Sequence, residues 1–369
     1  MKQDWEVKKL GELCTINTGR SNTEDAIENG EYAFFDRSKI IKRSSKYLFD
    51  CDAIIVAGEG QTFLPKFFSG KFDLHQRAYA LYNFNNKISI YYVYKYLIHF
   101  HKYFESVAVG ATAKSLRLRH FQELPIPFPP LPEQQRIVSI LDKAFVAIDK
   151  AKANAEQNLK NANELFESYL QSIFENKGDD WVEKPLGEIG KPSMCKRIMK
   201  HQTSTTGEIP FYKIGTFGKT PDAFISKEIY DEYRTKYSFP KKGDILISAS
   251  GTIGRRVRYD GEPAFFQDSN IVWIDNDENQ VLNDYLYVFY EFCEWQPSKG
   301  ATISRLYNSN LTSIKIVFPK SLEEQKNILK KINAVSIETK KLESIYQNKI
   351  EDLEELKKSI LQKAFSGEL

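Results

Sequence analysis

The sequence predicts an α+β protein made of two similar globular α/β domains, separated by two long antiparallel helices that form a coiled coil, with a pseudo-twofold internal repeat. Three observations predict it. The chain has 369 residues, more than a single core usually fills. A segment of its middle recurs near its end. Both copies of that segment continue into a long stretch with helical apolar spacing.

The repeat defines the domains. The segment "PLPEQQRIVSILD", which begins at Pro130, recurs as "SLEEQKNILKKI" from Ser321, at an offset of 191 residues, the separation of Leu131 and Leu322. Upstream, "GEYAFF" from Gly30 matches "GEIPFY" from Gly207, and "VGATAKSL" matches "KGATISRL". We predict a first domain over residues 1–130, a helix over 131–177, a second domain over 178–320 and a helix over 321–369.

The two helices are predicted from apolar steps of four and three, the spacing of a coiled-coil seam. The first seam is Ile137, Leu141, Ala144, Ile148, Ala151, Ala155, Leu159, Ala162, Phe166, Tyr169 and Ile173. The second is Ile328, Ile332, Val335, Thr339, Leu342, Tyr346, Ile350, Leu353, Ile360 and Ala364, with Lys357 as the one break. Both seams contain an extra step of four at the same point, where supercoiling should relax. If the helices pack along their length, chain order makes them antiparallel.

The start of each helix carries its own signals. Pro132 suits the first helical position, and Glu133 suits the positive end of the helix dipole. Ser321 and Glu324 have the spacing of a capping box. The prolines of "LPIPFPPLP" stiffen the link into the first helix, because they fix backbone angles and remove hydrogen-bond donors. This link should therefore fix the angle between each domain and its helix.

Composition and missing motifs exclude several classes of protein. The net charge is only +3, so any basic surface must be local. No apolar run could serve as a signal peptide or cross a membrane, which predicts a soluble cytoplasmic protein. Four scattered cysteines suggest neither zinc nor disulfides. Phosphate-binding, hydrolase, zinc-protease and methyltransferase motifs are all missing, and His99 and His101 read as structural, so we expect no catalytic site and no metal.

Two clusters of basic residues stand out, one in each domain and at matching places. "GATAKSLRLRH" contains Lys114, Arg117, Arg119 and His120, and "SGTIGRRVRYDG" contains Arg255, Arg256 and Arg258. Alternation predicts that Arg117 with Arg119, and Arg256 with Arg258, share one face of a strand. Such side chains neutralise phosphates or bond to guanine edges. The alternative is a charged strand edge that prevents aggregation. The full candidate DNA-binding set is Arg37, Arg77, Lys114, Arg117, Arg119, Lys213, Arg255, Arg256, Arg258 and Arg305.

These motifs together resemble the specificity subunit of type I restriction-modification systems over essentially the whole chain. The resemblance rests on the two "PLPEQQRI"-type helix starts, the "LQSIF" and "LQKAFSGEL" helix ends, "GATAKSL" before "LPIPFPPLPEQ", and "GDILISASGTIG". It implies two target-recognition domains, each reading one half of a split double-stranded DNA sequence. It also implies helices that bind two DNA adenine methyltransferase subunits, a restriction and translocation subunit, and no catalysis by this chain. The methyl donor, ATP and Mg²⁺ are then expected only on the partner subunits.

The resemblance also assigns residues to roles. Residues at the helix starts are expected to form the spacer and bind partners: Pro132, Glu133, Gln134, Ile137 and Leu141, then Leu322, Glu324, Gln325, Ile328 and Ile332. Gly110, Thr112, Lys114 and Ser115 fit the family's pattern before the last strand. The second copy has Ser304 and Arg305 there, so its basic group is shifted by one residue, and "GEGQTF" from Gly58 departs from the glycine turn of Gly251 and Gly254.

Two rival interpretations stay open from the sequence. One is the specificity chain of a methyltransferase-nuclease that cuts outside its site. The other is a tandem-repeat scaffold that binds only proteins, for which the basic clusters would be incidental.

Overall fold

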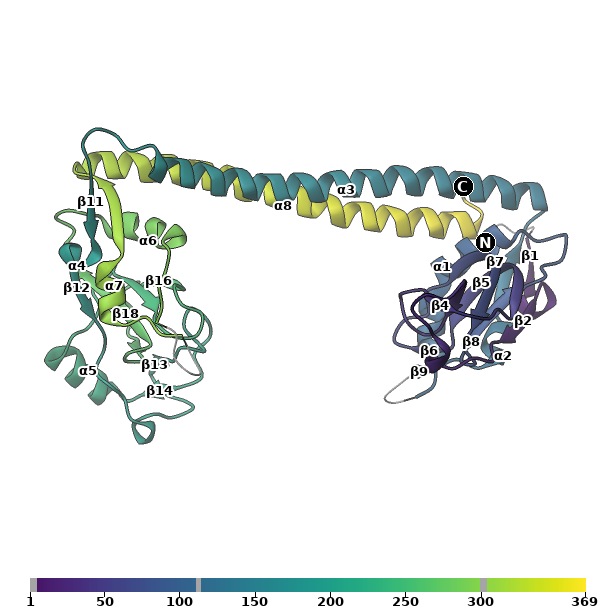
Figure 1. Ribbon diagram of the computed structural model, residues 1–369, viewed down its shortest axis with the longest axis horizontal. Coiled ribbons are helices and arrows are strands. Elements are labelled where there is room, and N and C mark those ends of the chain that lie inside the picture. Colours follow the sequence, from purple (N-terminus) through teal and green to yellow (C-terminus); the bar gives the residue numbers. More distant parts are fainter. Residues whose placement is uncertain (1–4, 111–113, 299–303) are drawn as a thin grey trace. The chain divides into compact units, whose positions relative to one another are not determined.

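The computed structural model describes residues 5–110, 114–298 and 304–369, and it contains two compact units (Figure 1). Unit 1 consists of Met1–Leu159 with Ser344–Leu369, and unit 2 of Lys160–Glu343. Two helices of 45 residues each, α3 (Leu131–Glu175) and α8 (Leu322–Ser366), contribute to both units. The repeated mixture of strands and helices, each followed by a long helix, confirms the predicted fold class.

Unit 1 is built on a six-stranded sheet of order β2-β8-β5-β7-β3-β4. Its strands are β2 (Thr15–Thr18), β3 (Tyr32–Phe35), β4 (Lys42–Ser44), β5 (Phe49–Ala57), β7 (Lys66–Leu74) and β8 (Ala78–Tyr82). Only β3 and β7 are parallel neighbours. The run "AIIV" within β5 is buried on both faces, as expected of a central strand. Two small pairs join β1 (Glu6–Lys9) to β10 (Pro125–Phe128) and β6 (Glu59–Gly60) to β9 (Lys114–Ser115).

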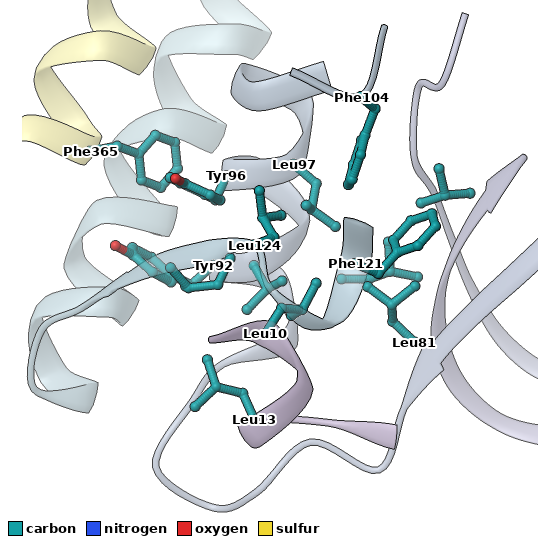
Figure 2. Packing of buried hydrophobic residues seen from close by; sticks show 14 of the residues in the cluster. Leu10, Leu13, Leu81, Tyr92, Tyr96, Leu97, Phe104, Phe121, Leu124 and Phe365 are labelled. Atoms are coloured by element: carbon teal, nitrogen blue, oxygen red, sulfur yellow. The ribbon is translucent and has the colours of Figure 1, made fainter. Parts of the chain in front are cut away.

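The larger core of unit 1 joins one side of this sheet to side chains from four helices. Helix α1 (Ile90–Val107) turns Tyr92 and Tyr96 toward Phe365 of α8, with ring centroids 5.4 and 5.1 Å from the Phe365 ring (Figure 2). On the other side of α1, Phe104 packs on Phe121 of α2 (Leu118–Gln122) at 4.9 Å. The last turns of α8 are therefore part of the core of unit 1.

Within unit 1, α3 and α8 run antiparallel, as predicted. Arg136 near the start of α3 donates to the main-chain oxygen of Leu369 at 2.7 Å. Further along the two helices, Lys357 pairs with Asp149 at 2.9 Å, and Lys152 pairs with Glu354. Lys357 is the break in the apolar seam, and the ion pair explains how the helix pair accepts a lysine at that position.

Unit 2 contains a four-stranded sheet, β12-β18-β15-β16, and a three-stranded sheet, β14-β13-β17. The strands are β12 (Gly190–Ser193), β13 (Ile209–Tyr212), β14 (Phe224–Ile225), β15 (Ile245–Ser248), β16 (Arg256–Arg258), β17 (Phe265–Phe266) and β18 (Ile271–Asn276), with β11 (Trp181–Pro185) paired to β19 (Lys315–Pro319). The helices are α4 (Leu186–Ile189), α5 (Lys227–Lys236), α6 (Asn283–Phe292) and α7 (Asn308–Ser313). One core joins α6 to Leu170 of α3 and Ile332 of α8.

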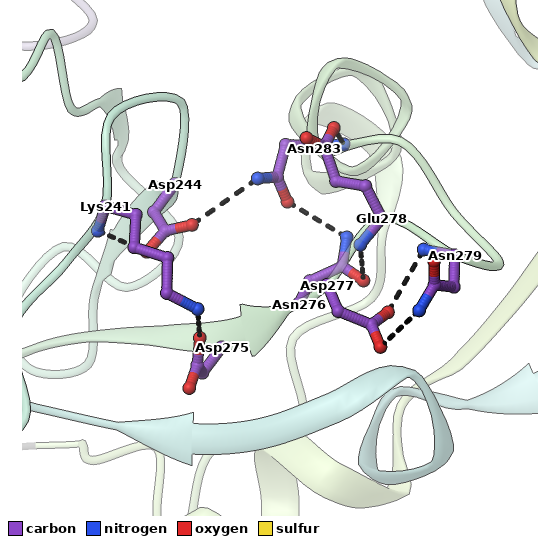
Figure 3. A network of polar contacts seen from close by, with 8 residues as sticks. All are labelled: Lys241, Asp244, Asp275, Asn276, Asp277, Glu278, Asn279 and Asn283. Carbon is purple, nitrogen blue, oxygen red and sulfur yellow. Dashed lines mark hydrogen bonds and ion pairs between the residues drawn. The ribbon is translucent and has the colours of Figure 1, made fainter.

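A buried polar network fixes the start of α6 in unit 2 (Figure 3). The Asn276 side chain donates to Val281 O at 2.7 Å and to Asn283 Oδ1 at 3.0 Å. Asp244 accepts from the Lys241 N–H at 2.7 Å and faces the Asn283 amide at 3.4 Å. Burial raises the pKa of the Asp244 carboxyl. Because buried polar groups are costly unless bonded, this closed network holds α6 in one register.

Candidate nucleic-acid interface

The two units share a set of backbone hydrogen bonds that we call the frame. In unit 1, the Gly58 N–H donates to Arg77 O at 2.8 Å and the Leu116 N–H donates to Gly58 O at 2.8 Å. In unit 2, the Ala249 N–H donates to Asn270 O at 2.7 Å and the Leu306 N–H donates to Ala249 O at 2.9 Å. Each frame begins directly after the first strand of a hairpin. This strand is β5 of the β5–β7 hairpin in unit 1 and β15 of the β15–β16 hairpin in unit 2.

The frame makes further residues equivalent between the units. Glu59 pairs with Ser115 across β6 and β9, and Ser250 forms a bridge with Arg305. Glu59 therefore corresponds to Ser250, and Arg77 to Asn270. Arg305 takes the place of Ser115, so the basic group of the second copy is shifted by one residue, as the sequence indicated. Equivalent backbone positions thus present different side chains in the two units.

In unit 1 the frame carries what we call the Glu59 cluster: Glu59, Arg37, Arg77 and Ser115. Glu59 forms an ion pair with Arg77 and a longer one with Arg37, with 3.8 Å between Arg37 Nη1 and Glu59 Oε2. Ser115 Oγ donates to the same carboxylate at 3.2 Å. The Glu59 side chain is only 14% exposed, whereas those of Arg37 and Arg77 are 61% and 60% exposed. One shielded carboxylate therefore anchors two guanidinium groups that face solvent.

The side chain of His75 contacts the backbone of this cluster. It is buried, and its Nδ1 accepts the Arg77 N–H at 3.0 Å. Burial lowers the pKa of His75, so the ring is neutral near pH 7 and its Nδ1 lone pair can accept this bond. The backbone of Arg77 is thus held by both His75 and Gly58.

In unit 2 the frame borders a polar cavity of about 500 Å³, which we call the unit 2 cleft. Its lining includes four basic residues: Arg197, Lys200, Lys213 and Arg305. Lys213 pairs with Asp222 at 2.8 Å, and Arg197 pairs with Asp268 at 2.7 Å. At the frame, Ser250 Oγ donates to Asn270 Oδ1 at 2.7 Å. The structure thus brings Lys213 and Arg305 together, two candidates far apart in the sequence.

The first basic cluster differs from the sequence prediction. Arg117 and Arg119 were expected on one face of a strand, but Arg117 is the residue before α2 and Arg119 lies inside this helix. Leu116, Phe121 and Leu124 are buried, and their spacing fits a short turn of helix at the edge of the core better than an alternating strand. Lys114 lies in β9 and donates to Glu105 O at 2.9 Å.

The second basic cluster does lie on a strand, but its side chains are paired within unit 2. Arg256 and Arg258 belong to β16 and form ion pairs with Glu291 and Asp284 of α6. Both guanidinium carbons lie over the Tyr287 ring, 4.5 and 5.4 Å from its centroid. Burial lowers the pKa of Arg256. Arg255 donates to Phe217 O at 3.1 Å.

The two basic clusters do not occupy matching positions, so that prediction was wrong. Arg258 pairs in register with Ile245 of β15, and the equivalent place in the β5–β7 hairpin is held by Phe67, opposite Ile54. Phe67 packs on Tyr91 of α1, with 5.0 Å between ring centroids. Unit 1 therefore uses aromatic packing where unit 2 uses arginines and acidic residues. The sequences of the two hairpins share no motif at these positions, so comparing the repeats could not show which residues are equivalent.

The expected partner-binding residues at the helix starts lie largely inside their own units. Gln134 and Gln325 are fully buried. Ile137, Leu141, Ile328 and Ile332 are also buried, in the cores of units 1 and 2. These six residues hold each helix on its domain and leave no surface for a partner, because an amphipathic helix buries its apolar stripe in its own core first. Pro132 and Glu324 are exposed, and Glu133 and Leu322 are half-buried.

Sequence reasoning missed Glu59 and the two glutamine contacts. The Gln134 side chain accepts the N–H of Ser89, the residue before α1, and the Gln325 side chain accepts the N–H of Leu282, the residue before α6. Both glutamines had been aligned, but nothing in a helix sequence shows which partners lie across the fold. Thr112 and Gly300, parts of the matched motif, lie outside the described residues.

The other expectations concern chemistry. In the described parts of the chain, no helix is long and apolar enough to cross a membrane, and no three His, Cys, Asp or Glu side chains are grouped to hold a metal ion. The four cysteines are free thiols, and burial raises the pKa of all four. His99 stacks on Phe365 and His101 bonds to Ile98 O, which are structural roles.

Comparison with known proteins identifies the family. Residues 2–160 and 178–352 each match the model of the type I restriction modification DNA specificity domain. A putative type I restriction enzyme specificity subunit from Haemophilus influenzae is 40% identical over 334 residues, covering 88% of this chain and 86% of its own. The MjaIX specificity subunit of Methanocaldococcus jannaschii is 22% identical, covering 100% and 94%.

Solved structures share the fold. One chain comes from a structure of complex assembly and conformational transition of the type I R-M system, with a TM-score of 0.76, 18% identity, and coverage of 100% of this chain and 99% of that one. The HsdS subunit from Thermoanaerobacter tengcongensis has a TM-score of 0.64 at 18% identity, covering 100% and 98%. These relatives belong to neither rival class. The chain belongs to the family of type I restriction-modification specificity subunits and carries two copies of the DNA specificity domain.

Proposed function

We propose that the two frames are the places where this specificity subunit reads the two halves of a split double-stranded DNA target. Unit 1 would use the Glu59 cluster and unit 2 the unit 2 cleft. One observation carries the proposal: the same backbone hydrogen bonds hold different polar and basic side chains in the two units. A pair of related domains that read different sequences needs a constant scaffold and variable contacts.

The remaining basic candidates would position the DNA. Lys114, Arg117 and Arg119 flank Leu116 of the unit 1 frame in the chain, and phosphate contacts require basic side chains near the surface without strict geometry. Arg255, Arg256 and Arg258 are engaged within unit 2 instead. We assign to Arg256 and Arg258 mainly the support of α6, and to Arg255 the contact with Phe217 O.

The long helices would bind two DNA adenine methyltransferase subunits, and a restriction and translocation subunit would complete the complex. Support comes from the family and from apolar side chains that the helix pairing leaves exposed: Val146 and Leu165 on α3, and Ile337, Leu342, Ile345 and Leu356 on α8. Exposed apolar residues on a helix are favourable contacts for a partner. These residues, rather than the buried helix starts, are our candidates for partner binding.

This chain would act without catalysis of its own, in the cytoplasm where the DNA is. The methyl donor, ATP and Mg²⁺ would belong to the partner subunits. Methylation requires the target base to leave the helical stack, and the methyltransferase would provide the pocket for it. The specificity subunit would bind and position both half-sites.

The test is co-expression with the neighbouring methyltransferase in a host without DNA methylation, followed by single-molecule sequencing of methylated adenines. We expect a split motif with a fixed gap. Replacing residues 1–130 by those of a relative should change one half of the motif only. A soluble complex that methylates no defined motif would contradict the proposal.

A further inference from the structure

We propose that Arg77 reads a guanine in the half-site of unit 1, and that Glu59 is the positioning residue that fixes its guanidinium group. The inference rests on the proposed function of the two frames. It goes further because it names one reading side chain, the base it selects and the residue that orients it.

The first argument is geometric. The Glu59 carboxylate binds one end of the Arg77 guanidinium, through Nη1. Among the described residues the other N–H groups of this guanidinium have no partner, and 60% of the side chain is exposed. Guanidinium is a planar fork with five donors, and guanine offers O6 and N7 as paired acceptors in the major groove. A fork held at one end and open at the other suits this contact.

The second argument concerns the backbone of Arg77. Its N–H is bound by His75 Nδ1 and its carbonyl by the Gly58 N–H. With the Glu59 carboxylate, Arg77 has three supports. His75 lies in the β7–β8 turn, Gly58 directly follows β5, and Glu59 lies in β6. A reading side chain must be held close to its productive geometry by neighbours that are themselves fixed. Arg37 shares Glu59 only at 3.8 Å, so we assign to it a looser, phosphate-directed role.

The third argument is energetic. Exposed ion pairs contribute little to stability, and shielding a carboxylate from water has a cost. At the equivalent place unit 2 holds the neutral pair Ser250 and Asn270, which share one hydrogen bond of 2.7 Å. The fold therefore does not need a charged pair here. What Glu59 and Arg77 add is an oriented positive fork on the surface of unit 1.

The experiment measures how tightly the complex of this chain with its methyltransferase binds DNA duplexes. The duplexes carry the sequence motif that the methylation mapping identifies. Each guanine of the unit 1 half-site is replaced in turn by 7-deazaguanine, which lacks the N7 acceptor. We expect one position at which wild-type affinity falls by about 2-fold to 12-fold, which is roughly half the free energy of a bidentate base contact, because the O6 acceptor is kept. At that position the Arg77→Ala complex should be insensitive to the replacement. Asn270→Ala, the matched control in unit 2, should keep the wild-type sensitivity.

Glu59→Gln tests the positioning role separately. It keeps the size of the side chain and removes its charge, so we expect the preference for guanine at that position to fall while the other positions of the half-site keep their wild-type preferences. A half-site without guanine, or Arg77→Ala that keeps full sensitivity at every guanine, would overturn the inference while leaving the proposed function intact. Absence of any methylated motif in the wild-type complex would instead refute the proposed function.

Discussion

Replacement of Gln134 by Met should destabilise unit 1 strongly although the side chain keeps its length. The Gln134 carbonyl accepts the Ser89 N–H at 2.8 Å, and its amide donates to Pro129 O at 2.8 Å and Lys87 O at 3.1 Å. The residue is fully buried, so water cannot replace the lost partner. Each buried group left unsatisfied costs about 1–3 kcal/mol.

Because the two carbonyls keep a second lone pair, the expected loss is about 2–5 kcal/mol rather than the sum of three full penalties. Gln325→Met is a matched variant. Its amide bonds to Pro319 O at 2.9 Å and Gln280 O at 2.8 Å, and its carbonyl accepts the Leu282 N–H at 2.9 Å. Each variant should affect its own unit, so each serves as the control for the other.

The assay combines urea unfolding with hydrogen exchange of the native protein. Gln134→Met should speed exchange around Ser89 and leave the segment around Leu282 unchanged, and Gln325→Met should do the reverse. A loss of stability below about 0.5 kcal/mol, the usual effect of a surface substitution, would refute the reasoning. Equal loss of protection in both units after either substitution would refute the idea that each glutamine anchors its own domain.

Three further predictions concern the same fold. Phe365→Ala should cost about 3–5 kcal/mol of stability, with exchange rising in unit 1 only, because this ring is buried against Tyr92 and Tyr96; unchanged melting would contradict it. Burial raises the pKa of Cys14 and of Cys195 to about 12, so in native protein at pH 8 both should react with a thiol reagent far more slowly than after denaturation, and equal rates would contradict this. Burial would raise the pKa of Asp36, but hydrogen bonds from Lys42 and Ser38 outweigh burial and lower this pKa. Its stabilising contribution is then present above the unfolded pKa and lost as the pH falls through the folded pKa, so the stability gap between wild type and Asp36→Asn should shrink below about pH 4, and a gap that widens there would contradict it.

The fold was largely predictable because its strongest signals are periodic and repeated. The offset between Leu131 and Leu322 located both long helices, and the structure begins helices at these two residues. Apolar spacing depends only on local sequence, and a repeat checks each assignment twice. The antiparallel pairing in unit 1 followed from chain order, once the apolar seams predicted that the two helices pack on each other.

The candidate site was less predictable because it is assembled from distant segments. Arg37, Glu59, Arg77 and Ser115 come from four parts of unit 1, and their contacts depend on strand register. Sequence clusters of arginine misled in two ways. Arg119 lies in a helix, and Arg256 is taken up by acidic side chains of α6, which no local pattern shows.

The assignment of one half-site to each frame is tested most directly by methylation mapping with two single variants. Arg77→Ala alters the frame of unit 1 and Asn270→Ala the equivalent position of unit 2. Sequencing of methylated adenines after co-expression should show relaxed sequence preference in one half of the motif for the first variant and in the other half for the second, with an unchanged gap. Relaxation of the same half by both variants, or an unchanged motif for both, would contradict the account.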